Sequence, residues 1–118
     1  MSDASIGTKP HYLVGDIGGT NARFAYVVPE QAQPQLLAKY RVADFQNFDE
    51  VMARLINDWR AVGLPDAGPG KTCLAVAAPP HLETISFTNS PWRFDHSLLG
   101  RYLTNSSIEI INDFAAVA

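Results

Sequence analysis

The sequence predicts an α/β domain in which helices cover a mixed sheet. Its 118 residues are 47% hydrophobic and 18% charged, which is typical of one globular domain with a substantial core. Two strand-like runs separated by a pair of glycines come first, as in an antiparallel hairpin. Segments with helical periodicity then alternate with further strands, as crossover connections do. Together these observations indicate a sheet with both antiparallel and parallel strands.

Three strands are expected in the first part of the chain. Residues 11–16 and 22–28 are rich in apolar side chains, and a third run follows at 36–42. Gly18 and Gly19 lie between the first two runs and predict a tight turn, because glycine adopts positive φ without steric cost.

The next segment has the period of a helix. Asn47 is expected to cap it, with Glu50 at the reciprocal position of a capping box. Gly63 and Pro65 are expected to end it. The apolar residues that recur at three- and four-residue steps are Phe48, Val51, Met52, Leu55, Ile56, Trp59 and Val62.

The second half of the chain alternates strands with helices. A buried strand is expected at 72–77 and a short strand at 84–88. Asp95 is expected to cap a second helix, and a last strand is expected at 108–111. Residues 114–118 read as the first turns of a further helix.

Charge and composition argue against several classes of function. Nine basic and twelve acidic residues give a net charge of −3, so no basic excess is available for a nucleic acid. The apolar runs are far shorter than the roughly 18 residues of a membrane span, so no membrane contact is expected. Residues 1–10 are expected to be a flexible leader without a signal peptide. One cysteine, Cys73, fits a reducing cytoplasm.

A glycine-rich segment between the first two strands is the first candidate for chemistry. Residues 15–23 (GDIGGTNAR) combine three glycines with a carboxylate, a hydroxyl, an amide and a guanidinium. Glycines let backbone N–H groups close on a phosphate, Thr20 and Asn21 add donors, and Asp16 can hold Mg²⁺ through water. The alternative is a tight hairpin with a polar tip. The dinucleotide pattern G-x-G-x-x-G does not fit, because a strand rather than a helix follows.

Two polar positions later in the chain are further candidates. Asn112 and Asp113 follow a buried strand, where open α/β sheets bind ligands, and Asp113 can act as a general base. The alternative is that Asp113 caps the helix that follows. Asn89 lies near Trp92 in a mix of amide, hydroxyl and indole groups that can line a sugar site. The alternative there is a proline-containing turn with a buried tryptophan.

Four motifs, in this order, resemble the N-terminal part of bacterial glucokinases, which are sugar kinases of the actin–hexokinase superfamily. The specific motifs are LVGDIGGTNARF at 13–24 and EIINDFAAV at 109–117. The supporting motifs are AAP at 77–79 and FTNSPWRF at 87–94. The likeness covers nearly the whole chain from Tyr12.

The resemblance implies a ribonuclease H-like fold, with a mixed five-stranded sheet in the order 3-2-1-4-5, an antiparallel strand 2 and flanking helices. It implies ATP-dependent phosphorylation of glucose to glucose 6-phosphate, with ATP, Mg²⁺ and glucose as ligands, and a homodimer for the full-length protein. Asp113 would deprotonate the 6-hydroxyl of the sugar, Asn89, Asn112 and Asp113 would bind glucose, and Asp16 would lie near Mg²⁺. The residues implied to hold the ATP phosphates are Gly15, Asp16, Ile17, Gly18, Gly19, Thr20, Asn21 and Arg23.

The chain departs from the family pattern in two respects. The family usually has a glycine-containing turn after the A-x-P segment, whereas this chain has PHLE at 80–83. Family members are also much longer, so residues 11–118 are expected to be the N-terminal lobe, truncated before the second lobe and inactive alone. The alternatives are a non-catalytic sugar- or nucleotide-binding regulator on the same fold, and a structural domain that keeps the hairpin. An intact Asp113 argues against both.

Overall fold

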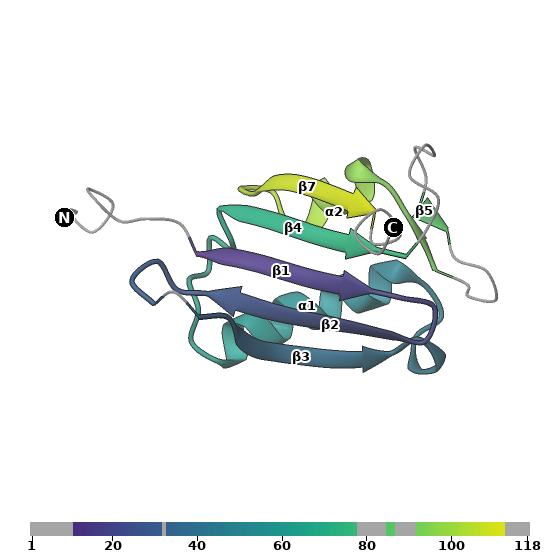
Figure 1. Ribbon diagram of the computed structural model, residues 1–118, viewed down its shortest axis with the longest axis horizontal. Helices are drawn as coiled ribbons and strands as arrows, with labels where there is room; N and C mark the ends of the chain where they lie inside the picture. The colour runs from purple at the N-terminus through teal and green to yellow at the C-terminus, as the bar shows by residue number, and fades with distance from the viewer. Residues whose placement is uncertain (1–10, 32, 78–84, 87–91, 113–118) are drawn as a thin grey trace.

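One five-stranded sheet and two helices form the core of the computed structural model, which describes residues 11–31, 33–77, 85–86 and 92–112. Figure 1 shows the sheet in front of the two helices. The elements are β1 (Tyr12–Ile17), β2 (Asn21–Val27), β3 (Gln35–Arg41), the 3-10 helix η1 (Val42–Asp44), α1 (Phe48–Ala61), β4 (Lys71–Val76), β5 (Ile85–Ser86), β6 (Arg93–Phe94), α2 (His96–Tyr102) and β7 (Ser107–Asn112).

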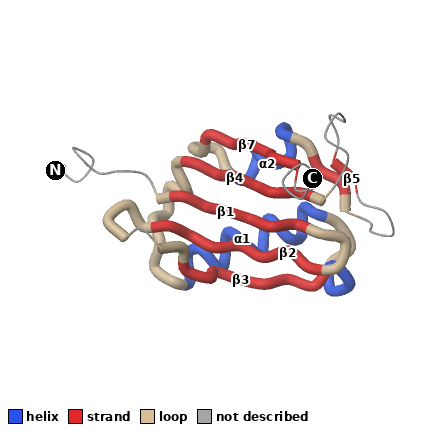
Figure 2. The backbone as a smooth tube through the Cα atoms, viewed as in Figure 1, coloured by secondary structure: helices blue, strands red, loops and turns tan. Residues whose placement is uncertain are grey.

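The sheet has the strand order β3-β2-β1-β4-β7. β2 is antiparallel to both β1 and β3, whereas β4 is parallel to both β1 and β7. Because β7 is the fifth strand of this sheet along the chain, the predicted order 3-2-1-4-5 with an antiparallel strand 2 is confirmed. Figure 2 shows the sheet strands in red as one layer, with the helices in blue on one side of it.

Most elements lie within one residue of their expected bounds. The predicted short strand at 84–88 corresponds to β5, and the rest of that range lies outside the described residues. β6 pairs with β5, and the sequence analysis does not predict it because two residues carry no periodic signal. The helix expected at 114–118 also lies outside the described residues.

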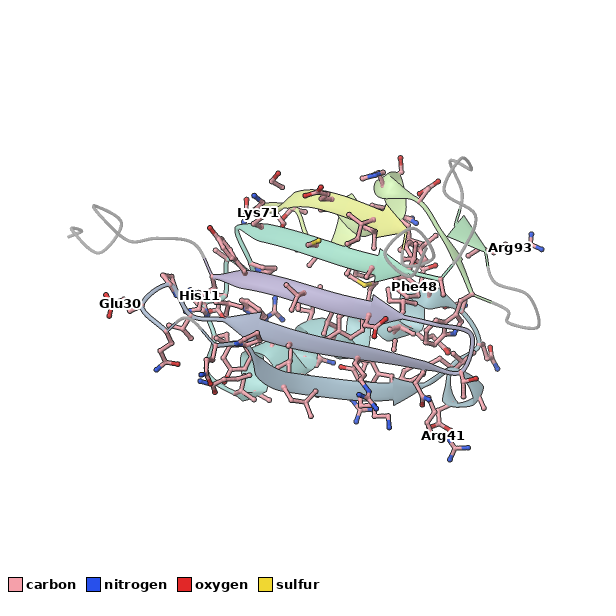
Figure 3. The ribbon with its side chains drawn as sticks, in the orientation of Figure 1. His11, Glu30, Arg41, Phe48, Lys71 and Arg93 are labelled. Carbon is pink, nitrogen blue, oxygen red and sulfur yellow. The ribbon has the colours of Figure 1, made fainter. Side chains whose placement is uncertain are left out.

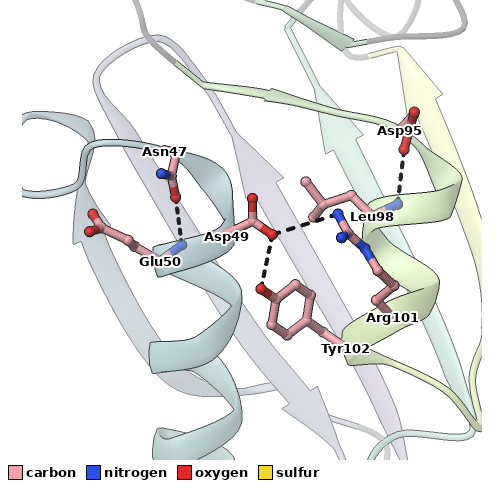
Figure 4. A network of polar contacts seen from close by, with 7 residues as sticks. All are labelled: Asn47, Asp49, Glu50, Asp95, Leu98, Arg101 and Tyr102. Atoms are coloured by element: carbon pink, nitrogen blue, oxygen red, sulfur yellow. Dashed lines mark hydrogen bonds and ion pairs between the residues drawn. The ribbon is translucent and has the colours of Figure 1, made fainter.

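Both helices begin at the capping residues that the sequence predicts (Figure 4). The backbone N–H of Glu50 donates to Asn47 Oδ1 at 3.0 Å, and the N–H of Leu98 donates to Asp95 Oδ1 at 2.9 Å. The Glu50 carboxylate also reaches back, but it accepts from the N–H of Gln46 at 2.7 Å rather than from Asn47. The predicted capping box is therefore shifted by one residue at its reciprocal bond.

The core lies between the sheet and the two helices. Phe48 of α1 stacks on Phe94 with ring centroids 4.2 Å apart, and it meets Trp92 edge-on at 5.4 Å. Trp92 is completely buried, as the alternative interpretation of its segment predicts. The buried apolar residues are Leu13, Ile17, Ala22, Phe24, Tyr40, Val42, Phe48, Val51, Met52, Leu55, Trp59, Leu74, Val76, Trp92, Phe94, Leu98, Leu99 and Leu103.

Polar contacts join the two helices across the core edge (Figure 4). The Tyr102 hydroxyl of α2 donates to Asp49 Oδ1 of α1 at 2.9 Å, and the Arg101 guanidinium lies 3.7 Å from the same oxygen. The hydrogen bond to Asp49 raises the pKa of Tyr102, because it stabilises the neutral phenol. Neither of the helices described here has the length and apolar character needed to cross a membrane.

The opposite face of the sheet carries apolar side chains that remain exposed. Side chains alternate along a strand, so residues between the core positions point to this face. Tyr12 of β1, Leu36 of β3 and Ile111 of β7 are 42%, 70% and 43% exposed. Among the described residues, both α1 and α2 lie on the other side of the sheet (Figure 1).

Candidate functional site

The turn that joins β1 to β2 is held from three sides by backbone hydrogen bonds. Within the turn, the N–H of Gly18 donates to the carbonyl of Asn21 at 3.0 Å. The N–H of Val42 in η1 donates to Thr20 O at 2.9 Å, and the N–H of Ala77, just after β4, donates to Ile17 O at 3.1 Å. Two distant segments therefore fix the position of this turn.

Two donors of the turn remain available. Among the described residues, no hydrogen bond uses the backbone N–H of Gly19 or of Thr20. Both residues are exposed. Successive backbone N–H groups in a turn form a concave site for anions, such as phosphate oxygens. The geometry of this turn therefore suits the binding of a phosphate.

Gly15 and Gly18 lack a side chain for different reasons. A Cβ at Gly15 would lie 2.7 Å from Leu74 Cδ2 and 2.9 Å from Phe24 Cε1, so core packing requires the glycine. A Cβ at Gly18 would meet only the carbonyl of Asn21 at 3.7 Å, which is an ordinary contact. The fold leaves room at Gly18 for an approaching group.

The predicted reason for the glycines in the turn is wrong. The described glycines with positive φ are Gly63 and Gly68, at 87° and 81°, and the turn glycines are not among them. The hairpin between β1 and β2 forms as predicted, but Gly18 and Gly19 do not adopt the positive φ that was expected of them. Because Gly18 has no side chain, the space beside it is open except for the Asn21 carbonyl.

Asp16 and Arg23 lie directly opposite each other on β1 and β2. Both are exposed, and among the described residues neither has an ion-pair partner. A hollow of about 400 Å³ on the open face of the sheet includes both of them and extends to Leu36. One carboxylate and one guanidinium therefore flank the turn and remain available to a charged ligand.

The strand register brings the end of β7 to the edge that holds the turn. Ile17 pairs with Val76, and Val76 pairs with Asn112, so the three residues form one row across parallel strands. Neighbouring strands are about 4.8 Å apart, which places the Asn112 backbone about 10 Å from Ile17. Asp113, the next residue in the chain, and Asn89 both lie outside the described residues.

The carboxylate of Asp16 is the candidate metal ligand at this edge of the sheet. Among the described residues, no group of three or more His, Cys, Asp or Glu side chains can hold a metal. Mg²⁺ usually binds through one or two carboxylates together with substrate phosphates and water. The exposed carboxylate of Asp16 fits that requirement.

Sequence reasoning identified the turn but missed the residues that hold it. Val42 and Ala77 contribute only backbone N–H groups, which have no signature in the sequence. Polar residues that directly follow predicted parallel strands are the signal that a sequence-based search can use, because the carboxyl ends of parallel strands meet at one edge.

The mixed sheet and its polar edge define a ribonuclease H-like α/β lobe of the kind that binds ligands at strand ends. The family model for glucokinase matches residues 13–118 of the chain. The glucokinase of Marinobacter nauticus is 38% identical over 112 residues, which are 94% of this chain and 33% of that protein. The glucokinase of Mesorhizobium japonicum is 34% identical over 118 residues, which are 100% of this chain and 33% of that protein. The chain therefore belongs to the glucokinase family.

Solved structures of glucokinases share the fold. The crystal structure of a glucokinase from an Antarctic psychrotroph has a TM-score of 0.71 and 31% identity, covering 93% of this chain and 34% of that one. A glucokinase from Balamuthia mandrillaris, crystallised in complex with glucose, has a TM-score of 0.66 and 26% identity, covering 94% and 31%. The chain spans about a third of the length of these relatives.

Proposed function

We propose that the chain is the N-terminal lobe of a glucokinase that transfers the γ-phosphoryl group of ATP to glucose. The observation that carries the proposal is the turn at residues 18–20, which is fixed by three backbone hydrogen bonds and keeps two N–H donors available. Phosphoryl transfer depends mainly on positioning and on stabilising charge, so a rigid turn with free donors suits it. Membership of the glucokinase family supports the choice of reaction.

The turn and its neighbours would bind the phosphates of ATP. The N–H groups of Gly19 and Thr20 would donate to phosphate oxygens, and the space at Gly18 would let the phosphate chain approach the backbone. Arg23 would offset part of the phosphate charge. Asp16 would hold Mg²⁺ through water, and the metal, when bound, neutralises charge that develops on the transferred group.

The adjacent end of β7 would bind and activate glucose. Asn112 is the last residue of β7 and lies in the same row of the sheet as Ile17. A sugar held there would therefore lie next to the proposed phosphate-binding turn. Asp113 would accept the proton of the 6-hydroxyl as general base, and Asn89 would contribute a further contact with the sugar. The part of a relative's length that this chain does not cover would complete the cleft.

Substitution of Asp113 by Asn in the full-length kinase that carries this lobe tests the proposal. Asn keeps the size of the side chain and much of its hydrogen bonding, but it cannot accept the proton. We expect turnover to fall by about 10²- to 10⁴-fold, with glucose binding largely retained. Turnover, glucose affinity and melting temperature are to be measured together.

The same substitution separates catalysis from helix capping. Asn is a good N-cap, so a residue that only caps a helix would lose little on this change. Near-normal turnover in a folded Asp113→Asn variant would contradict the proposal.

A further inference from the structure

A cavity of about 130 Å³ lies on the helix-bearing side of the sheet, at the end opposite the turn. It is bounded by the start of β1, the last turns of α1, the loop before β4 and the segment that follows α2. Trp59 of α1 lines it and meets the ring of His11 edge-on, with centroids 6.4 Å apart. Figure 3 labels His11 at this end of the molecule and Arg41 at the other. The cavity is separate from the proposed phosphate site.

The inner wall of the cavity is apolar. Leu13, Leu55, Trp59 and Leu103 line it and are at most 5% exposed. For comparison, an apolar cavity of about 150 Å³ in another protein holds benzene. The volume here is therefore suited to one six-membered apolar ring.

The loop that closes the cavity is held in place. The indole N–H of Trp59 donates to the carbonyl of Pro65 at 2.7 Å, and the Asn105 side-chain amide donates to Ala67 O at 3.1 Å. Gly68 supplies the left-handed backbone conformation of the loop, with φ 81°. These contacts keep the wall in position without a ligand, which lowers the entropic cost of binding.

The rim of the cavity carries one positive and one negative side chain. Arg60 and Asp66 both line it and are exposed. Among the residues that the structure describes, neither forms an ion pair, with the other or with a third residue. A ligand that bears both an ammonium and a carboxylate complements these two charges, whereas an anion or a cation alone satisfies one of them and is repelled by the other.

We propose that this cavity binds a small zwitterion with a single aromatic ring, of the aromatic amino-acid class. The ring enters between α1 and β1, and the charged groups stay at the rim beside Arg60 and Asp66. Ring burial supplies most of the affinity, because exposed ion pairs contribute little. The inference goes beyond the proposed phosphoryl transfer and does not depend on it.

Titration of the purified chain with phenylalanine, followed by amide and indole NMR shifts, tests the proposal. We expect a saturable shift of the Trp59 indole N–H, with a dissociation constant of the order of 1 mM, and an unchanged Trp92 signal. Phenylacetate and phenethylamine, which each carry one of the two charges, should bind about two- to fivefold more weakly. An unchanged Trp59 signal, or equal binding of all three compounds, would overturn the proposal.

Three variants with matched controls locate the binding. Arg60→Gln and Asp66→Asn, both at exposed positions, should each weaken phenylalanine binding about two- to fivefold, whereas Arg41→Gln at the opposite end should have no effect. Ile56→Trp should fill the cavity and abolish binding, while Ala53→Leu on the same helix, away from the cavity, should not. Equal effects of Arg60→Gln and Arg41→Gln would rule out this site, even if Ile56→Trp does not fold.

Discussion

Gly15 and Gly18 lie three residues apart and meet different surroundings. The side of β1 at Gly15 faces Leu74 and Phe24, whereas Gly18 faces open space beside Asn21 O. The sequence shows a glycine-rich segment but does not separate these roles, because the atoms that decide them come from β2 and β4. The distinction between a glycine that core packing requires and a glycine with room beside it therefore appears only in the packed fold.

Alanine substitutions at the two glycines should differ in their effect on stability. We expect Gly15→Ala to lower the free energy of unfolding by about 1–3 kcal/mol, because its Cβ overlaps the Leu74 and Phe24 side chains. Gly18→Ala should change it by less than about 0.5 kcal/mol. Urea unfolding of both variants measures the difference. Equal losses of stability would contradict the packing argument.

At the scale of the elements, a buried tyrosine joins the edge strand β3 to α1. The Tyr40 hydroxyl donates to Asp58 Oδ2, and Tyr40 is only 6% exposed. Burial, with the hydrogen bond to the Asp58 carboxylate, raises the pKa of Tyr40 well above the usual value for tyrosine. This contact connects β3 to α1. Between these two elements lies η1, whose Val42 N–H holds the turn.

Tyr40→Phe should change both the stability and its pH dependence. At neutral pH we expect a loss of about 1–3 kcal/mol, because the variant loses the hydrogen bond to a charged acceptor. Since the folded-state pKa is raised, the neutral tyrosine contributes stability that is present below about pH 10 and is lost as the pH rises further. The wild-type protein should therefore lose more stability than Tyr40→Phe between about pH 9 and pH 11. Parallel alkaline slopes in chemical unfolding would show that Tyr40 is not responsible.

Most of the fold could be predicted from the sequence, because periodicity and capping act locally. The apolar period of α1 and the caps Asn47 and Asp95 lie within a few residues of what they determine. The strand order that places β4 between β1 and β7 is a long-range property, and it became an expectation only through resemblance to a family. The register that aligns Ile17, Val76 and Asn112 is visible only in the structure. The cavity beside Trp59 could not be predicted, because four separate segments form its walls.

At the scale of the whole molecule, the sheet has one face covered by helices and one face open. Tyr12, Leu36 and Ile111 on the open face leave apolar area in contact with water. Such patches mark surfaces that associate with other chains or with further parts of the same chain. We therefore expect the isolated chain to self-associate through this face.

Substitution of Leu36 by Lys should reduce self-association of the chain. Leu36 is 70% exposed on the open face, and a charge there should repel a second apolar surface. Val62→Lys is the matched control, since Val62 is 54% exposed at the end of α1 on the helix side. Sedimentation equilibrium should show a lower average mass for Leu36→Lys than for the wild type or for Val62→Lys. A monomeric wild type at high concentration would contradict the expectation.

The central claim is that the turn between β1 and β2 binds phosphates through the N–H groups of Gly19 and Thr20. Titration of the isotope-labelled chain with magnesium tripolyphosphate, observed through backbone amide signals, tests it most directly. We predict saturable shifts that are largest at Gly19 and Thr20, and their loss in Gly18→Val, whose branched side chain occupies the approach to the turn. Shifts spread over other parts of the chain with none at the turn, or turn signals that persist in Gly18→Val, would contradict the account.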